Sequence, residues 1–193
     1  MGLLLAVLAP MGAVIAFVLR IGRAIGIVAI AVMVVAILIQ VVARYVFNNA
    51  LPWPDEAARF CMLWMTGLMA PTAFRRGGFV ALDMISGLMS DRVAAVLSLV
   101  LLLISALILS VAVQIGWGEV TGFGGRFATA SLYIPTFDGW FRIPRSWMML
   151  SLLVGVILLL AVNIELILRS VVRMMGGGDR LPEIDMGGMA GAE

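Results

Sequence analysis

Polar side chains inside long apolar stretches are the first candidates for chemistry, because each is costly in a membrane unless it finds a partner. Gln40 and Arg44 are four residues apart, so they share one face of a helix. Asp55 and Glu56 follow after a short turn that contains two prolines. A guanidinium group pairs readily with a carboxylate, so Asp55 or Glu56 is the expected partner of Arg44. The alternative is that Arg44 reaches the membrane surface alone.

The other polar residues in apolar surroundings are Gln114, Asn163 and Glu165. Glu165 stands four residues before Arg169, which predicts a local ion pair at the membrane interface. The chain has no histidine and a single cysteine, Cys61. These two facts exclude bis-histidine haem sites and Ser–His triads, and they argue against zinc sites. We therefore predict no catalytic residue, no bound cofactor and no metal ion.

The composition places these residues in a membrane. Of the 193 residues, 63% are hydrophobic and only 12% are charged, and the mean hydropathy is +1.14. A soluble domain has about twice that share of charged residues. The net charge of +2 gives no support for nucleic-acid binding. A chain this apolar needs the bilayer as its solvent.

Four apolar runs of roughly 20 residues are long enough to cross a hydrocarbon core of about 30 Å. They cover residues 24–43, 57–74, 93–117 and 146–164, and the second is the weakest because it carries Arg59 and Pro71. Isolated strands leave backbone groups unpaired in lipid, so the runs must be helices. The predicted fold is an all-α integral membrane protein with about four transmembrane helices.

The flanking segments divide the chain into three parts. Residues 1–23 are apolar but interrupted by Pro10 and Gly12, and we expect them to lie at the interface or against a partner. A signal-like segment or an extra span is the alternative, although a signal peptide has its basic residues before the apolar run. Residues 24–169 form the four-helix membrane domain. Residues 170–193 form a glycine-rich, flexible cytoplasmic tail.

Two further patterns suggest contact surfaces. The pairs Gly22 with Gly26 and Ser151 with Gly155 have the spacing that allows helices to approach closely. The long segment 118–145 carries six aromatic residues among glycines. It is expected to be either an interfacial docking surface on the outer side or a plain aromatic belt.

Three motifs in the first half of the chain resemble a known family. Residues 44–49 read Arg-Tyr-Val-Phe-Asn-Asn, residues 51–60 read Leu-Pro-Trp-Pro-Asp-Glu-Ala-Ala-Arg-Phe, and residues 75–83 read Arg-Arg-Gly-Gly-Phe-Val-Ala-Leu-Asp. Their order and spacing resemble those of the small, Q-type (DctQ-like) membrane subunit of TRAP transporters, which are tripartite ATP-independent periplasmic importers. Two positions depart from the family pattern: Pro54 replaces a Ser or Thr helix cap, and Phe79 replaces a histidine.

The resemblance implies a scaffold subunit that packs against a large membrane subunit and helps to dock a periplasmic substrate-binding protein. The large subunit would hold the substrate, usually an organic acid, and the coupling sodium. The expected location is the bacterial inner membrane. Two rival hypotheses stay open: a self-sufficient homo-oligomeric transporter, and an assembly or regulatory four-helix protein. Positioning roles are expected for a set of interface residues, six from the family motifs together with Gln40 and Asp55. The full set is Gln40, Arg44, Trp53, Asp55, Glu56, Arg75, Arg76 and Asp83.

The arginines predict the orientation, because positively charged residues gather on the cytoplasmic side. If the N-terminus is cytoplasmic, eight of the 13 arginines lie inside. These are Arg20, Arg23, Arg75, Arg76, Arg92, Arg169, Arg173 and Arg180. Both termini are therefore predicted to be cytoplasmic.

This orientation is tested by fusing a reporter after Met175. We expect alkaline phosphatase to be inactive at this position and green fluorescent protein to be fluorescent, because only the former needs export. Active phosphatase would reverse the predicted orientation.

Overall fold

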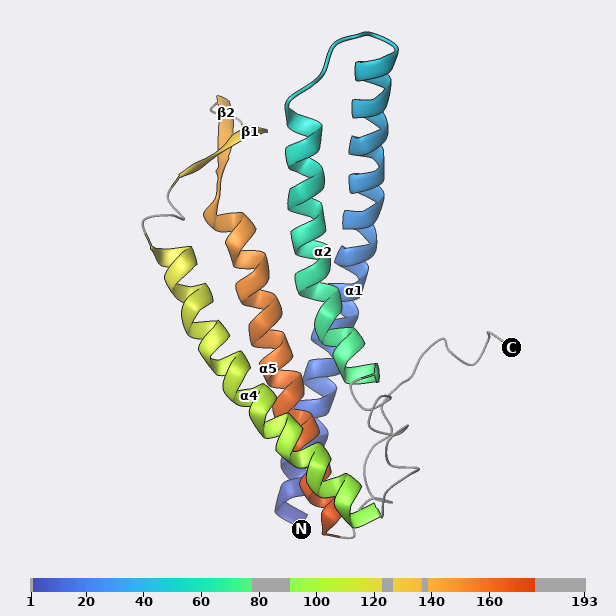
Figure 1. Ribbon diagram of the computed structural model, residues 1–193, viewed down its shortest axis with the longest axis vertical. Helices are drawn as coiled ribbons and strands as arrows, with labels where there is room; N and C mark the ends of the chain where they lie inside the picture. Colours follow the sequence, from blue (N-terminus) through green and yellow to red (C-terminus); the bar gives the residue numbers. More distant parts are fainter. Residues whose placement is uncertain (1, 78–90, 123–126, 137–138, 176–193) are drawn as a thin grey trace, which may run out of the picture.

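The computed structural model describes residues 2–77, 91–122, 127–136 and 139–175. Its helices are α1 (Gly2–Tyr45), α2 (Trp53–Gly77), α4 (Asp91–Thr121) and α5 (Ser146–Met174), and its strands are β1 (Ala128–Thr136) and β2 (Gly139–Pro144) (Figure 1). The helices cover all four predicted runs. The prediction of an all-α membrane protein is confirmed.

Helix α1 is longer than its predicted membrane span. It has 44 residues and a length of about 66 Å, roughly twice the thickness of the hydrocarbon core. We expected Pro10 and Gly12 to interrupt the N-terminal segment, and this was wrong, because the helix continues through both. A proline removes one backbone hydrogen bond, and in membrane helices neighbouring helices and small local adjustments compensate for the loss. The position of the first 23 residues at an interface stays a prediction.

Within the described residues, three helices are long and apolar enough to cross a membrane, and they lie in Leu8–Tyr45, Val93–Thr121 and Ser146–Met174. Helix α2 carries charged residues at both ends, but its 25 residues reach about 37 Å, enough to cross as well. Within the chain, 39% of the most apolar part of α5 is buried, against 17% for α1 and 6% for α4. Helices α1 and α4 therefore form the outer faces, whereas α5 lies inside.

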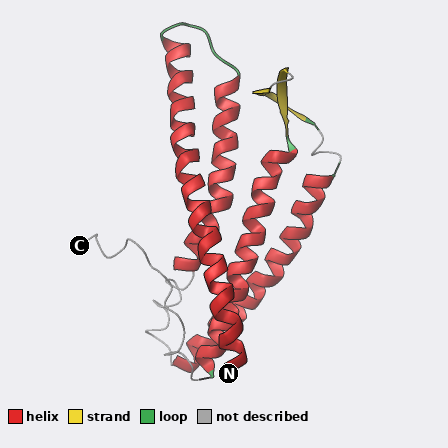
Figure 2. Cartoon of the chain, turned by 180° about the vertical axis from the view of Figure 1, so that it is seen from behind, coloured by secondary structure: helices red, strands yellow, loops and turns green. Residues whose placement is uncertain are grey.

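The helices form two antiparallel hairpins, α1 with α2 and α4 with α5, and they pack together through α2 and α5. The hairpins lie close together in the lower half of Figure 1 and diverge toward its top, and the view from behind agrees (Figure 2). A small buried core is formed by Leu19, Leu102, Val162 and Leu166. Side chains from α1, α4 and α5 thus meet there.

Small residues form the crossing between α2 and α5. A Cβ atom added to Gly67 would clash with the backbone carbonyl of Ser151, and one added to Gly155 would lie 2.7 Å from the Gly67 Cα. The predicted small pair Ser151 and Gly155 therefore meets a third small residue, Gly67, on α2. The other pair, on α1, lies against Leu68 and Met69 of α2. Both pairs stand where helices approach closely, as their spacing predicts.

The segment between α4 and α5 contains a β-hairpin that the sequence did not predict. Strands β1 and β2 pair antiparallel, with Tyr133 opposite Arg142 and Thr136 opposite Gly139. The Arg142 guanidinium lies 5.5 Å from the centre of the Tyr133 ring, a distance at which a cation–π interaction stabilises the pair. Strand β1 also contacts α2, and β2 contacts α5. The hairpin therefore joins the two helix pairs at their diverging ends.

The α2–α5 crossing makes a prediction with opposite signs for two glycines. Gly67→Ala forces the helices apart and should destabilise the protein by about 1–3 kcal/mol, the cost of overpacking. Gly118→Ala meets nothing within 4 Å and should stabilise α4 by up to about 1 kcal/mol through helix propensity. Thermal unfolding in detergent measures both variants. Equal effects on the two melting temperatures would contradict the close crossing.

Candidate functional site

A buried carboxylate on α5 is held by two arginines. Glu165 of α5 is fully buried, and the side chains of Arg75 and Arg169 are 11% and 9% exposed. Arg75 binds it through both ends of the guanidinium fork: Nε donates to Oε2 at 2.9 Å and Nη2 donates to Oε1 at 2.7 Å. Arg169 adds two bonds to Oε1, from Nε at 3.0 Å and from Nη2 at 2.9 Å. We call Arg75, Glu165 and Arg169 the charge cluster.

The charge cluster ties three helices together. Arg75 belongs to α2 and Glu165 to α5, and Arg75 Nη2 also donates to the backbone carbonyl of Gly12 on α1 at 3.1 Å. A Cβ atom at Gly12 would lie only 3.1 Å from Glu165 Oε1, so a glycine allows α1 to approach the carboxylate. Gly12, which we had considered a helix breaker, therefore serves a packing role.

The charge cluster differs from the sequence prediction in burial and in membership. We expected Glu165 and Arg169 to form a local ion pair at the interface. The pair exists, but it is buried, and Arg75 joins it from a position 90 residues away in the chain. A buried carboxylate next to one arginine still needs hydrogen bonds for its second oxygen. Arg75 supplies that bond. A buried three-residue cluster therefore forms instead of a pair on the helix surface.

Asn163 is a second buried polar residue, two positions before Glu165 in the sequence. With its amide oriented to match its surroundings, Nδ2 donates to the Leu102 carbonyl at 3.3 Å and Oδ1 accepts from the Ala106 N–H at 3.0 Å. Both partners lie on the backbone of α4, one turn apart. Asn163 therefore joins α5 to α4, whereas Gln114, another sequence candidate, is exposed.

At the upper end, Asp55 accepts a hydrogen bond from Gln40 Nε2 at 3.3 Å, which links α1 to the first turn of α2. We had expected Arg44 to bind Asp55 or Glu56. Arg44 is exposed, one turn beyond Gln40 on α1, and the α1 contact to Asp55 comes from Gln40 instead. The amide reaches the carboxylate because Gln40 is itself buried against α2.

The remaining predicted interface residues separate into two groups. Trp53 and Glu56 lie in the first turn of α2, where Trp53 is 40% exposed and Glu56 is half-buried. Arg75 and Arg76 lie in the last turn of α2, near the charge cluster and not near Trp53. Asp83 lies outside the described residues. The structure thus distributes the predicted residues between the two ends of α2 rather than into one site.

Polar pairings between helices, apolar outer faces and a charge-neutralised carboxylate are features of a multi-pass membrane protein. The chain also matches a family model described as "Tripartite ATP-independent periplasmic transporters, DctQ component", over residues 33–173. The chain therefore belongs to the DctQ component family of TRAP transporters. Members of this family are components of a transport system and not enzymes. No curated protein and no solved structure matches the chain.

The charge cluster predicts a large effect of one uncharged substitution. Glu165→Gln leaves Arg75 and Arg169 buried without a counter-charge, and it should destabilise the protein by about 3–5 kcal/mol. Glu119→Gln, at an exposed position on α4, is the matched control and should change stability by less than about 0.5 kcal/mol. Thermal unfolding in detergent compares the two.

A triple variant separates charge from packing. Arg75→Met, Glu165→Leu and Arg169→Met together remove all three charges, and such replacements often restore stability. The triple variant should therefore unfold at a higher temperature than Glu165→Gln alone. If it is less stable than the single variant, the loss comes from packing and not from unpaired charge.

Proposed function

We propose that this chain is the non-catalytic scaffold subunit of a sodium-coupled TRAP importer for an organic acid. It sits in the bacterial inner membrane with both termini in the cytoplasm and packs against the large membrane subunit, which binds the substrate and sodium. The observation that carries the proposal is the state of Glu165. A static frame needs its charges neutralised permanently, and Glu165 accepts four hydrogen bonds from two arginines.

Glu165 also weighs against the rival hypothesis of a self-sufficient transporter. A carboxylate that couples transport must exchange partners or protons, so it needs access to a pathway through the protein. Glu165 is fully buried, and charged donors bind both of its oxygens. Both features oppose an exchange of partners or protons. This carboxylate is therefore suited to holding helices together.

The outer faces of the helices support a role as a partner in a larger membrane complex. On α1, Val28, Val35 and Leu38 are 55–62% exposed, and on α4, Ile104 and Leu107 are 51% and 67% exposed. Lipid chains and the helices of another subunit are equally suitable surroundings for such faces. We propose that one of the two faces, on α1 or on α4, packs against the large subunit and that the other contacts lipid.

The upper end supports the proposed docking of the periplasmic binding protein. The β-hairpin and the turn between α1 and α2 lie at this end (Figure 1), and with cytoplasmic termini it faces the periplasm. Tyr133 and Arg142 of the hairpin are exposed, and tyrosine and arginine are enriched where proteins bind each other. The hairpin offers these side chains on a short paired frame instead of an irregular loop.

Copurification tests the scaffold role. We expect the tagged chain, extracted in mild detergent, to retain a large multi-helix permease in fixed stoichiometry. A stable homo-oligomer that drives ion-dependent uptake in liposomes by itself would establish the self-sufficient transporter instead. A folded chain with neither a permease partner nor uptake would favour the assembly or regulatory hypothesis.

Two interface variants test the predicted positioning residues. Arg44→Ala and Glu56→Ala should lower uptake by the reconstituted system roughly tenfold, which corresponds to about 1.4 kcal/mol. Substrate binding by the soluble component should be unchanged. The matched controls are Arg59→Ala and Glu119→Ala, which remove the same charges from exposed positions. A change in substrate preference would contradict a scaffold role.

A further inference from the structure

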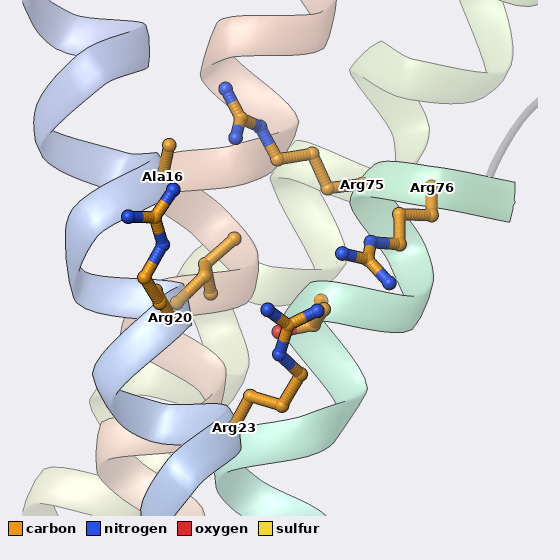
Figure 3. Close-up of a pocket in the computed structure, with 7 residues that line it drawn as sticks. Ala16, Arg20, Arg23, Arg75 and Arg76 are labelled. Atoms are coloured by element: carbon orange, nitrogen blue, oxygen red, sulfur yellow. The ribbon is translucent and has the colours of Figure 1, made fainter. Parts of the chain in front are cut away.

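A small cavity with a strongly cationic lining lies between α1 and α2. Its volume is about 90 Å³, which is room for several water molecules or for one compact anion. Four arginines, two small or apolar residues and one hydroxyl form its wall, and Figure 3 shows this region in close-up. The lining residues are Ala16, Leu19, Arg20, Arg23, Thr72, Arg75 and Arg76.

The arrangement of the arginines calls for a counter-ion. Figure 3 shows Arg20 and Arg23 on the α1 ribbon and Arg75 and Arg76 on the α2 ribbon, with the guanidinium groups of Arg23 and Arg76 pointing toward each other. Like charges that face each other repel one another, and the repulsion grows as water is excluded. An anion between them would turn this repulsion into attraction.

The carboxylate next to the cavity is already committed. In the described part of the chain, the ion pairs of Glu165 are with Arg75 and Arg169, and Arg20 and Arg23 belong to neither. Arg20 and Arg23 on α1 therefore face the cavity, while the neighbouring carboxylate of Glu165 pairs with Arg75 and Arg169. Among the described residues, the ion pairs do not supply a counter-charge to either Arg20 or Arg23.

Thr72 gives a second, independent indication of a ligand. Its hydroxyl oxygen is buried, and among the described residues it has no hydrogen-bond partner. A buried hydroxyl without a partner costs free energy, so its presence in a cavity wall is best explained by a bound group that accepts its hydrogen. Phosphate oxygens accept hydrogen bonds from both hydroxyl and guanidinium groups.

The depth of the cavity identifies the source of the anion. Arg20 and Arg23 directly precede the uncharged run 24–43, whose 20 residues reach about 30 Å and end beside Arg44. The cavity is therefore level with the boundary of the hydrocarbon core, where the phosphates of phospholipids lie. Ala16 and Leu19 add an apolar wall next to the arginines.

We propose that this cavity binds the phosphate of an anionic phospholipid. Arg20 and Arg23 contact the phosphate oxygens, Thr72 donates a hydrogen bond from its hydroxyl, and the acyl chains run along the apolar surface of α1. The leaflet is the cytoplasmic one in the proposed orientation. The binding itself does not depend on the role in transport, because it rests only on the residues of this chain.

Native mass spectrometry of the purified protein, together with any subunit that copurifies, tests this site. The probes are dioleoylphosphatidylglycerol and dioleoylphosphatidylethanolamine, added separately to delipidated protein. We expect selective retention of the phosphatidylglycerol. The double variant Arg20→Gln and Arg23→Gln should lose roughly 30-fold in affinity, the size expected for two arginine–lipid charge interactions near a membrane surface.

The matched control is the double variant Arg59→Gln and Arg173→Gln, which removes the same net charge from exposed positions away from the cavity. It should retain the lipid as the unmodified protein does.

Thr72→Val is a milder variant that keeps the side-chain shape and removes the buried hydroxyl. It should fold normally and bind phosphatidylglycerol several-fold more weakly.

Four outcomes would overturn the proposal. Equal loss of lipid in the control would mean that overall charge, not this cavity, binds it. Equal retention of the two phospholipids would remove the preference for an anionic headgroup. Full displacement of the lipid by millimolar inorganic phosphate would identify a soluble anion as the ligand. If the double variant Arg20→Gln and Arg23→Gln loses the copurifying subunit but still binds the lipid, a carboxylate of that subunit is the counter-ion.

Discussion

The structure depends on the cost of placing a carboxylate in an apolar interior. Glu165 is fully buried, and a buried ion requires an opposite charge and hydrogen bonds for each of its oxygens. One arginine on the same helix cannot supply all of these bonds, so α2 has to bring Arg75, and α1 has to offer the Gly12 carbonyl to Arg75 in turn. Three helices are thereby held together at one point, and the apolar core around Leu166 packs beside it.

The helices were predictable from the sequence because the bilayer sets their length, and uncharged runs of about 20 residues have few alternatives. The two ends of α2 and the start of α5 were also close to prediction, since arginines and prolines mark them, whereas α5 continues ten residues beyond its predicted end. The continuity of α1 was not, because Pro10 and Gly12 normally signal an interruption. Gly12 is explained only by the carboxylate that approaches it, and that approach depends on a tertiary contact.

The polar contacts between helices were only partly predictable. Periodicity places Gln40 and Arg44 on one face, but it does not decide which of them reaches Asp55. The link from Arg75 to Glu165 leaves a weak signal: each residue stands about 20 positions from the N-terminal end of its helix, so both lie at a similar depth. Depth narrows the possible partners without selecting one. The β-hairpin left less trace, because glycines and prolines stand in and beside its strands.

The separation of Arg75 and Glu165 along the chain has a consequence for biogenesis. Arg75 is synthesised 90 residues before the carboxylate that neutralises it, an interval of about 5–18 s at common translation rates. During that time the α1–α2 hairpin can enter the membrane, but its arginine must stay in contact with water or lipid phosphates. Arg169 never experiences this delay, because it leaves the ribosome just after Glu165. The last helix to be made therefore completes the integration of the first two.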